Sequence, residues 1–535
     1  MIAVSSGWVN AHQETLLPEM FLELTYGATE PGLQLDASAS SSDETAFSEV
    51  ETVVNGEDKY SEQYAALEHG FWGLTGDFTF FDGTPVDPGF VSDKVAGEDG
   101  VFSDPPKISI GFSQQHTLLI PGITITWSDT YNEWATAFRV TALNAGVVVN
   151  QTTVTGNSSP VTPVWIDMES YNQITIEILS WSHPGHRARC IEVYMGIEKV
   201  YTKEDLLGFD HSQTADLLSA TLPKNTISFR LRNEDNRWNP DNPTGSEKYL
   251  LEQQEVKLRY GMRVDGGIEW IKGGTFWLSE WSTPSNGLEV SFTARDAFEF
   301  MNTLYTGPRS GSLRQIALAA LEQAALPPMD DGSVRYVVSD TLSAYNADFT
   351  ADNTEYTIAQ ILQLVAHAGC CVMHQDREGM VRIEPQSDKY SGYIIEPHHS
   401  YSHPEYTMNK PLRAVAVSYG EDQTATVVHG VSGETQTVSN VMLRTENDAL
   451  RVGNWTKSVL ENRKVISGEY RADVRLDVLD NIIVSSKYAS NIIGVTEVNF
   501  STTGGAIRGK YTGRVVSINL KPADRRSGEF YSGEV

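Results

Sequence analysis

The stretch from Gly273 to Met301, GGTFWLSEWSTPSNGLEVSFTARDAFEFM, constrains the fold of this chain more than any other. Apolar and polar residues alternate in TFWLSEW and again in LEVSFTA, and the intervening TPSNG is rich in turn-forming residues. Because successive side chains of a strand point to opposite faces, this pattern predicts an antiparallel β-hairpin with one buried face. A polar step at Arg295–Asp296 then leads into an apolar run, so a second element follows the hairpin.

The composition sets the broad class of the protein. A length of 535 residues corresponds to about three to five domains. A hydrophobic fraction of 40% is enough for packed cores. The net charge of −30 argues against nucleic acid as a partner, because phosphate binding needs clustered Lys and Arg. We therefore expect a folded chain whose acidic surface keeps it soluble and repels other polyanions.

Cysteine usage and the absence of targeting signals indicate where the chain folds. The three cysteines are Cys190, Cys370 and Cys371, an odd number that includes two adjacent residues and makes a poor disulfide framework. Residues 1–20 lack a basic region followed by an apolar core, so they do not resemble a secretion signal. No apolar run approaches the ~20 residues of a membrane helix. These features predict folding in a reducing cytoplasm without a membrane segment.

The first part of the chain is predicted to be rich in β-structure. Within residues 1–30, the segment FLELTY at 21–26 alternates like a short strand. Residues 31–58 are rich in Ser, Ala and acidic side chains, which predicts an exposed linker or long loop. Residues 59–196 contain short strands at regular spacing, separated by Asp-Gly, Pro-Gly and Gly-Asn turns. This layout is typical of an antiparallel β-sandwich, and its position predicts a domain inserted into a loop of another. If so, the strand at residues 21–26 should pair with the sheet formed by residues 221–300.

The remaining chain is predicted to contain two β regions around an α+β domain. Residues 197–300 include the hairpin described above and read as antiparallel β-structure. Residues 301–398 contain two helices, one beginning after Ser312 and one from about Thr357, each with capping-box spacing. Residues 399–535 return to β-structure with one interrupting helix. The two β regions make a duplicated barrel physically possible.

Four residues in the middle of the chain resemble a set of zinc ligands: His367, Cys370, Cys371 and His374. Zinc ligands usually come as two separated pairs, so that a loop can fold around the ion. Here a helix runs directly into a strand, and Cys370 and Cys371 therefore point to opposite sides. We expect small buried hydrophobic residues rather than a metal site.

Two loops carry other possible metal ligands. His398, His399 and His403 lie in a segment rich in Pro and Ser, where histidines are usually solvated. The segment NEDNRWNPDNPTG contains Asp235, Asn239 and Asp241 but lacks the central glycine and final glutamate of a calcium loop. A tight structural turn is the better interpretation. We predict neither a bound metal nor a cofactor.

No catalytic constellation is recognisable. The sequence contains no GxSxG, HExxH, Walker A or Rossmann pattern between a strand and a helix. The 70 acidic residues leave open chance pairs of carboxylates of the kind that cleave glycosides. We predict that the chain is not an enzyme.

An aromatic set in the predicted sandwich suggests a possible glycan site. Aromatic rings stack on sugar faces when polar neighbours hold the hydroxyl groups, but tryptophans also fill the core of a small sandwich. The wider set also includes Trp165, His186 and Arg189, and the candidates for glycan binding are Trp127, Tyr131, Trp134, Trp181, His183 and Arg187.

Several segments resemble one family of proteins, in the same order. The segment LPKNTISFRLRNEDNRWNPDNPTGSEKYLLEQQEVKLRYGM, together with the opening hairpin, looks like the first tube-like barrel of phage baseplate or tail-tip hub proteins. TIAQILQLVAHAGCCVMHQDREGMVRIEP is similar to their middle α+β domain, and GEYRADVRLDVLDNIIVSSKY with IIGVTEVNFSTTGGAIRGKYTGRVV resembles their second barrel. ITITWSDTYNEWATAFRVTAL and SWSHPGHRARCIEVYMGI resemble the galactose-binding-like sandwiches that some tail proteins carry as insertions.

The resemblance implies a fold and a role. The fold would be mainly β, with two tail-tube-like antiparallel β-barrels, an α+β middle domain and the inserted sandwich. Three such chains would form a homotrimeric, pseudo-sixfold ring at the distal end of the tail tube, in a phage or a phage-tail-like particle. Its partners would be the distal tail protein or tail tube, the tape-measure protein and a spike or tip protein in a separate chain.

Two further expectations follow from the resemblance. In many hubs a peptidoglycan-cleaving domain follows the second barrel, whereas this chain stops about twenty residues after the last strand of that barrel, so we expect no lytic activity. The alternative is a carbohydrate-binding adhesin or receptor-recognition protein that binds a host glycan through the sandwich.

Overall fold

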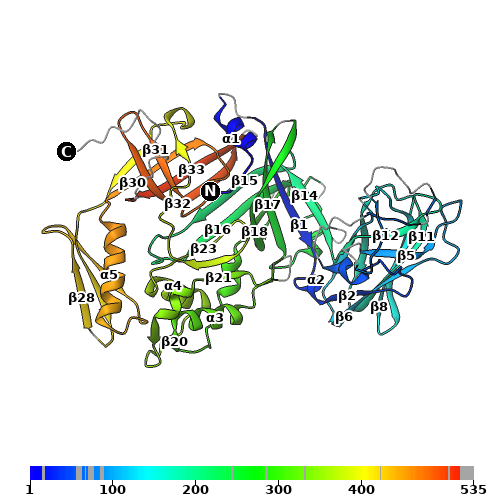
Figure 1. Ribbon diagram of the computed structural model, residues 1–535, viewed down its shortest axis with the longest axis horizontal. Helices are drawn as coiled ribbons and strands as arrows, with labels where there is room; N and C mark the ends of the chain where they lie inside the picture. The colour runs from blue at the N-terminus through cyan, green and yellow to red at the C-terminus, as the bar shows by residue number, and fades with distance from the viewer. Residues whose placement is uncertain are drawn as a thin grey trace.

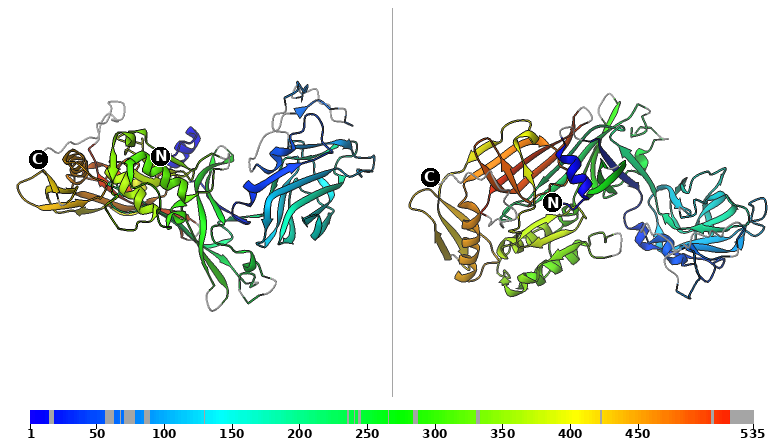
Figure 2. Two further views of the ribbon diagram at one scale, coloured as in Figure 1. Left: turned by 90° about the horizontal axis from the view of Figure 1, so that it is seen from below. Right: turned by 45° about the horizontal axis from the view of Figure 1, so that its top comes forward.

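The structure is a computed structural model. The structure describes residues 1–14, 18–55, 63–66, 68–69, 78–84, 89–128, 130–234, 236–239, 241–242, 245–264, 266–283, 287–329, 333–421, 423–503 and 506–517. The fold is mainly β, as predicted. A large curved sheet forms the centre of the molecule, and the sandwich lies to one side of it in every view (Figure 1 and Figure 2).

The central sheet has thirteen strands. Their spatial order is β14 (Ile197–Thr202), β1 (Met20–Ala28), β17 (Glu255–Val264), β18 (Gly267–Ser282), β19 (Glu289–Arg295), β16 (Lys224–Arg232), β15 (Leu206–Thr214), β32 (Ser490–Thr503), β33 (Ala506–Val515), β30 (Lys464–Arg471) and β26 (Glu405–Met408). In addition, β31 (Asn481–Ser485) pairs with β32, and β25 (Ile394–Ile395) pairs with β31. We call the strands from β14 to β15 the first half and the others the second half.

Alternating burial explains why these segments form one sheet. In β16, Ile227, Phe229 and Leu231 are buried, whereas Ser228 and Arg230 between them are exposed. The predicted hairpin is confirmed, since β18 and β19 pair antiparallel. Across the described residues no sheet closes into a barrel, so barrel closure remains a prediction.

The two halves share one hydrophobic core. It contains Leu22 from β1, Phe229 from β16, Tyr470 from β30 and Phe500 from β32. Helix α1 (Ser6–Gln13) covers part of this core with Trp8, which is buried. The expected pairing of residues 21–26 with the sheet of residues 221–300 is also present, because β1 lies beside β17.

The sandwich contains more of the chain than residues 59–196. Its larger sheet has the order β2 (Ala37–Ser40), β6 (Lys107–His116), β11 (Tyr171–Trp181), β8 (Ala135–Asn144) and β9 (Val147–Thr155). Facing elements are β10 (Val161–Met168), β7 (Ile120–Thr126) and β13 (Glu192–Tyr194), with the pair β12 (Arg187–Cys190) and β5 (Phe90–Val95). The short elements α2 (Leu33–Asp36), η1 (Val50–Val54), β3 (Gln63–Tyr64) and β4 (Phe78–Thr79) complete this region.

The prediction of an exposed linker at residues 31–58 is wrong for its described part. Strand β2 pairs with β6, and Leu33, Val50 and Val53 are buried in the sandwich core. These widely spaced apolar residues carry no visible periodicity, and they fill the core from a loop-like segment.

The α+β domain agrees with its predicted helices. Both α3 (Leu313–Ala324) and α4 (Ile358–Ala368) begin with a complete capping box, at Ser312 and Thr357. Around them lie β21 (Tyr336–Val338), β24 (Val381–Glu384) and β23 (Val372–Gln375), the pair β20 (Ser310–Ser312) and β22 (Asn346–Asp348), and the 3-10 turns η3 (Ala297–Met301) and η4 (Asp340–Ala344).

Residues 399–535 do not form one β domain. Strands β27 (Leu412–Tyr419), β28 (Gln423–Val428) and β29 (Glu434–Ser439) form a separate sheet against α5 (Glu446–Leu460). Apolar side chains of β27 and α5 join the core of α3 and α4. This subdomain therefore packs on the α+β domain and is not part of the central sheet. The remaining 3-10 turns are η2 (Glu247–Tyr249) and η5 (Pro397–His399).

Candidate functional site

The two halves of the central sheet meet edge to edge. Strands β15 and β32 pair antiparallel, from Asp210 opposite Ser501 to Thr214 opposite Glu497. We call this ladder the seam. It makes one continuous sheet from the two sets of strands by pairing two strands that are almost 300 residues apart in the sequence, and its two faces differ sharply in polarity.

The core face of the seam holds a buried histidine. His211 Nδ1 lies 2.9 Å from the Tyr260 hydroxyl, and its Nε2 lies 2.9 Å from Asn225 Oδ1. Burial holds the pKa of His211 well below its usual range, and the nearby Arg377 guanidinium acts in the same direction. The ring is therefore neutral and serves as a packed, hydrogen-bonded part of the core.

Arg377 ties the middle domain to both halves behind the seam. It lies in the turn between β23 and β24 and donates hydrogen bonds to Gln213 Oε1 at 3.2 Å and to the Leu476 carbonyl at 2.8 Å. Its guanidinium also stands 5.6 Å from the centre of the Phe500 ring. Gln213 belongs to β15 of the first half, Phe500 belongs to β32 of the second half, and Leu476 lies between the second-half strands β30 and β31.

The two halves repeat the same strand pattern. The first half contains the spatial order β15, β16, β19, β18 and β17. The second half has the corresponding order β26, β30, β33, β32 and β31. Both long hairpins also shift register at the corresponding point, between Leu278 and Glu280 in β18 and between Val495 and Glu497 in β32. A β-bulge is a specific local feature, so its recurrence fixes the alignment of the two sets.

The sequences agree once the strands are aligned by their partners. Residues 278–281 read LSEW where residues 495–498 read VTEV, and residues 291–295 read SFTAR where residues 510–514 read KYTGR. Residues 226–232 likewise read TISFRLR where residues 465–471 read VISGEYR. The central sheet is therefore an internal duplication.

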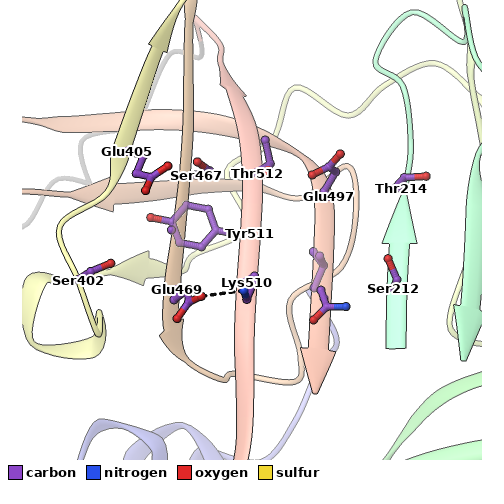
Figure 3. Close-up of a pocket in the computed structure, with 13 residues that line it drawn as sticks. Ser212, Thr214, Ser402, Glu405, Ser467, Glu469, Glu497, Lys510, Tyr511 and Thr512 are labelled. Atoms are coloured by element: carbon purple, nitrogen blue, oxygen red, sulfur yellow. Dashed lines mark ion pairs between the residues drawn. The ribbon is translucent and has the colours of Figure 1, made fainter. Parts of the chain in front are cut away.

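The outward face of the seam is polar and hollowed. A depression of about 690 Å³ is lined by side chains from β15, β32, β33, β30 and β26 and by Ser402 just before β26, and Figure 3 shows these side chains on their strands. Polar side chains that line it are Ser212, Thr214, Ser402, Glu405, Ser467, Glu469, Glu497, Asn499, Lys510 and Thr512.

The chemistry of this hollow suits a wetted surface. Lys510 forms an ion pair with Glu469 at 2.7 Å and lowers the pKa of that carboxyl. The other lining groups are mostly hydroxyls, which exchange hydrogen bonds with water easily. No described nucleophile in this hollow is paired with a general base.

The four residues considered as zinc ligands have separate surroundings. His367 Nδ1 lies 3.1 Å from Asn440 Nδ2, and burial lowers the pKa of His367 to about 4. Cys371 is buried and Cys370 half-buried, and burial raises the pKa of both thiols. Among the described residues, no group of three or more His, Cys, Asp or Glu side chains is arranged to hold a metal ion.

The histidines of residues 398–403 include one that is not solvated. His399 is buried, its ring centre lies 5.8 Å from that of His12, and burial lowers the pKa of His399 to about 4. His398 and His403 are exposed. Sequence reasoning missed His12, because α1 brings it from the other end of the chain.

The turn considered as a calcium loop is held by its own amide groups. Asn239 Oδ1 accepts the backbone N–H of Asp241 at 3.0 Å, and Asn233 Oδ1 accepts that of Trp238 at 3.0 Å. Asp235 lies outside the described residues.

Two of the predicted glycan-binding aromatics lie in the sandwich core. Trp127 and Trp181 are 0% and 2% exposed, so neither ring can stack on a sugar. They pack against each other at 6.0 Å, because a small sandwich needs large side chains to fill its interior. The prediction that these two residues form part of a glycan surface is wrong.

The other candidates surround a buried carboxylate at one end of the sandwich. Glu133 accepts hydrogen bonds from Trp181 Nε1 and is paired with His186 Nδ1, both at 2.7 Å. Tyr131 is half-buried beneath Arg189, 4.8 Å from its guanidinium. The exposed His183 ring stacks on His186 at 5.4 Å.

Trp134 and Arg187 are both half-buried, and hydrogen bonds to the backbone hold them in place. The Trp134 indole N–H donates to the Asn157 carbonyl at 3.1 Å. The Arg187 guanidinium donates to the carbonyls of Ser92 and Asp93. No helix of the described chain is long and apolar enough to span a membrane.

A search of known families and of curated proteins finds no match to this sequence. Solved structures with a remote likeness include a 43 kDa tail protein of prophage MuSo2 from Shewanella oneidensis, with a TM-score of 0.40 and 11% identity over 59% of this chain and 94% of that one. A tail protein from Neisseria meningitidis gives 0.41 and 10% over 60% and 94%. The family 32 carbohydrate-binding module of NanJ from C. perfringens, solved with galactose, gives 0.20 and 18% over 33% and 99%.

Proposed function

We propose that this chain is a structural protein of a phage tail or of a related tail-like injection particle. Within that particle it would be the hub, a homotrimer that caps the distal end of the tail tube and connects it to a tip or spike protein. The sequence resemblance described above suggests this role.

The duplicated sheet is the observation that carries the proposal. A chain with two equivalent strand sets, joined edge to edge by the seam, presents twice as many repeats as subunits. Three copies would present six repeats, which matches a sixfold tube without requiring six chains. A protein at the boundary between a sixfold tube and a threefold tip needs such an arrangement.

The polar face of the seam would line the ring. Hydroxyl and amide side chains such as Ser212, Asn499 and Thr512 bind water and offer no large apolar surface to a passing polymer. The acidic net charge would also repel nucleic acid that passes the hub. In this role the chain has no catalytic task, and the tape-measure protein and a separate spike protein would be its neighbours.

The mass of the assembly tests the proposal. Mass photometry of the purified protein, alone and with isolated tail tubes, should give a species of three chains in at least one condition. Negative-stain images of the tube complex should then show added density at one end of the tube only. A protein that remains monomeric and leaves tubes unchanged would contradict the proposal.

A second function, glycan binding by the sandwich, is favoured by one observation. Tyr131 and the exposed His183 lie near the buried Glu133, and a sugar could stack on a ring while polar groups hold its hydroxyls. A glycan array should then detect binding that Tyr131→Ala abolishes. Trp165→Ala is the control, since Trp165 is 60% exposed and belongs to β10. Equal loss in both variants, or no binding, would contradict this function.

A further inference from the structure

Strand β26 is the counterpart of the seam strand β15, but it has no partner on its outer edge among the described residues. The alignment of the two halves makes Tyr406 and Met408 the equivalents of His211 and Gln213. His211 and Gln213 are 0% and 1% exposed, whereas Tyr406 and Met408 are 45% and 56% exposed. The same position is therefore buried in the first half and open in the second.

The strand that corresponds to β32 also has an open edge. In β32, one edge is shared by β31 at its beginning and by β15 at its end. In β18, the equivalent edge is taken by β17 only up to Trp277, and no described strand pairs with it at residues 279–282. Among the described residues, the chain thus contains one complete seam and two strand edges without a partner that correspond to its two sides.

We propose that β26 of one copy pairs antiparallel with residues 280–283 at the end of β18 in a second copy. This inter-copy ladder would repeat the seam between subunits. The closure of this ladder into a ring of three copies rests on the proposed function. The unpaired N–H and C=O groups of an open strand edge form hydrogen bonds with another strand when one is available. The β18 edge of a second copy is equivalent to the β32 edge that pairs with β15 in the seam.

The seam fixes the register of this ladder. In the seam, Ser212 lies opposite Asn499 and Gln213 opposite Val498. Their equivalents place Thr407 opposite Ser282 and Met408 opposite Trp281. The Met408 thioether would then pack on the half-buried Trp281 ring, a favourable sulfur–aromatic contact.

The charges at both edges allow the copies to approach. Each chain carries a net charge of −30, so two copies repel at long range. At the β18 edge, however, the carboxylate of Glu280 is neutralised by Arg295 at 2.7 Å. The facing residues Thr407, Met408 and Asn409 are uncharged. Among the described residues that would lie opposite each other, no two unpaired like charges meet, and Glu405, the charged residue of β26, would lie beyond the pair of Tyr406 and Thr283.

A cysteine pair placed across the ladder tests the register. Directly opposed residues of an antiparallel pair bring their Cβ atoms to about 4.5–5.5 Å, close enough for a disulfide after a small adjustment. The variant carrying both Thr407→Cys and Ser282→Cys should form covalent oligomers up to the trimer under mild oxidation, on tail tubes or free. Each single variant should not, since Cys190 and Cys371 are buried and Cys370 is half-buried.

A matched pair controls for chance collisions. Ser291 lies opposite Ser282 on β19, one strand further from the open edge, so Thr407→Cys with Ser291→Cys should not cross-link. Trimers by mass photometry without a Thr407–Ser282 cross-link would overturn the ladder and leave the trimeric hub standing. A monomer under every condition would overturn both.

A second variant separates assembly from folding. Met408→Glu places a charge at the proposed contact and should weaken self-association at least tenfold, with an unchanged melting temperature because Met408 is exposed in the single chain. Val428→Glu, at another exposed position on β28, should leave association unchanged. If Met408→Glu assembles like the unmodified protein, the ladder is wrong.

Discussion

Gln253 and Leu479 adopt the same left-handed backbone conformation, with φ of 66° at both residues. Each residue also makes the same hydrogen bond. The Gln253 N–H donates to the Leu278 carbonyl at 2.7 Å, and the Leu479 N–H donates to the Val495 carbonyl at 2.8 Å. Both carbonyls belong to the residue that precedes the β-bulge. The duplication therefore extends to single backbone torsions. In each half, the residue with positive φ lies just before the point where β17 or β31 begins.

A glycine at position 253 should stabilise the protein. A residue other than glycine pays a steric cost in the left-handed region, and the exposed Gln253 side chain forms no hydrogen bond to the described residues that would offset it. We expect Gln253→Gly to raise the free energy of unfolding by about 1 kcal/mol, as measured by urea titration. Glu252→Gly is the control, since Glu252 is exposed but lacks the positive φ, and it should be neutral or destabilising.

Removal of the Arg377 side chain should loosen the seam. Arg377→Ala would leave Gln213 Oε1 and the Leu476 carbonyl without their donor in a buried site. The expected loss is about 3 kcal/mol of unfolding free energy in a denaturant titration. Lys272→Ala removes an exposed ion pair with Glu378 and should cost less than about 1 kcal/mol. Equal effects in the two variants would contradict the role assigned to Arg377.

Acid should destabilise the protein partly through His367. Burial lowers the pKa of His367 to about 4, whereas an unfolded chain binds the proton near 6.5. The contribution of the neutral His367 ring to the free energy of unfolding is thus complete above pH 6.5, and it is lost as the pH falls from 6.5 to about 4. His367→Gln should reduce the loss of stability over this range by up to about 3 kcal/mol, whereas His403→Gln, at an exposed position, should not. Melting curves at several pH values measure the difference.

Local signals predicted the elements that are determined locally. The hairpin of residues 273–295 alternates clearly, and the helices after Ser312 and Thr357 carry complete capping boxes. These features depend on neighbours in the sequence, so periodicity and spacing were sufficient to find them. The pairing of β1 with β17 was also expected, because a lone strand before an insertion needs a sheet.

The sequence indicated a duplication only as a possibility and through the resemblance, and it gave neither the alignment of the two halves nor the seam. The repeated residues fall in short strands, and the loops between them differ in length: residues 409–463 separate β26 from β30, whereas only residues 215–223 separate β15 from β16. No fixed period survives such insertions. The buried positions of Trp127 and Trp181 likewise depend on how two sheets pack together, which residue type alone does not determine.

The ends of the sandwich insertion meet in the central sheet, which makes its removal testable. Ala28 of β1 lies directly opposite Ile197 of β14. Replacement of residues 29–196 by Asn-Gly would therefore join the two strands through a two-residue hairpin turn. We expect a folded protein that still forms the assembly of the full chain. The shorter excision of residues 59–196 should aggregate, because it leaves Leu33, Val50 and Val53 without the sandwich core that buries them.

Deletion of residues 1–26 should be far more damaging than removal of the sandwich. It removes most of β1, whose loss exposes the backbone of β14 and β17, and it removes Trp8 from the shared core. Circular dichroism melts and gel filtration of the Asn-Gly variant, the excision of residues 59–196 and the deletion of residues 1–26 measure which of them fold and assemble. Unfolding of the Asn-Gly variant combined with normal melting of the N-terminal deletion would mean that the sandwich, and not β1, supports the central sheet.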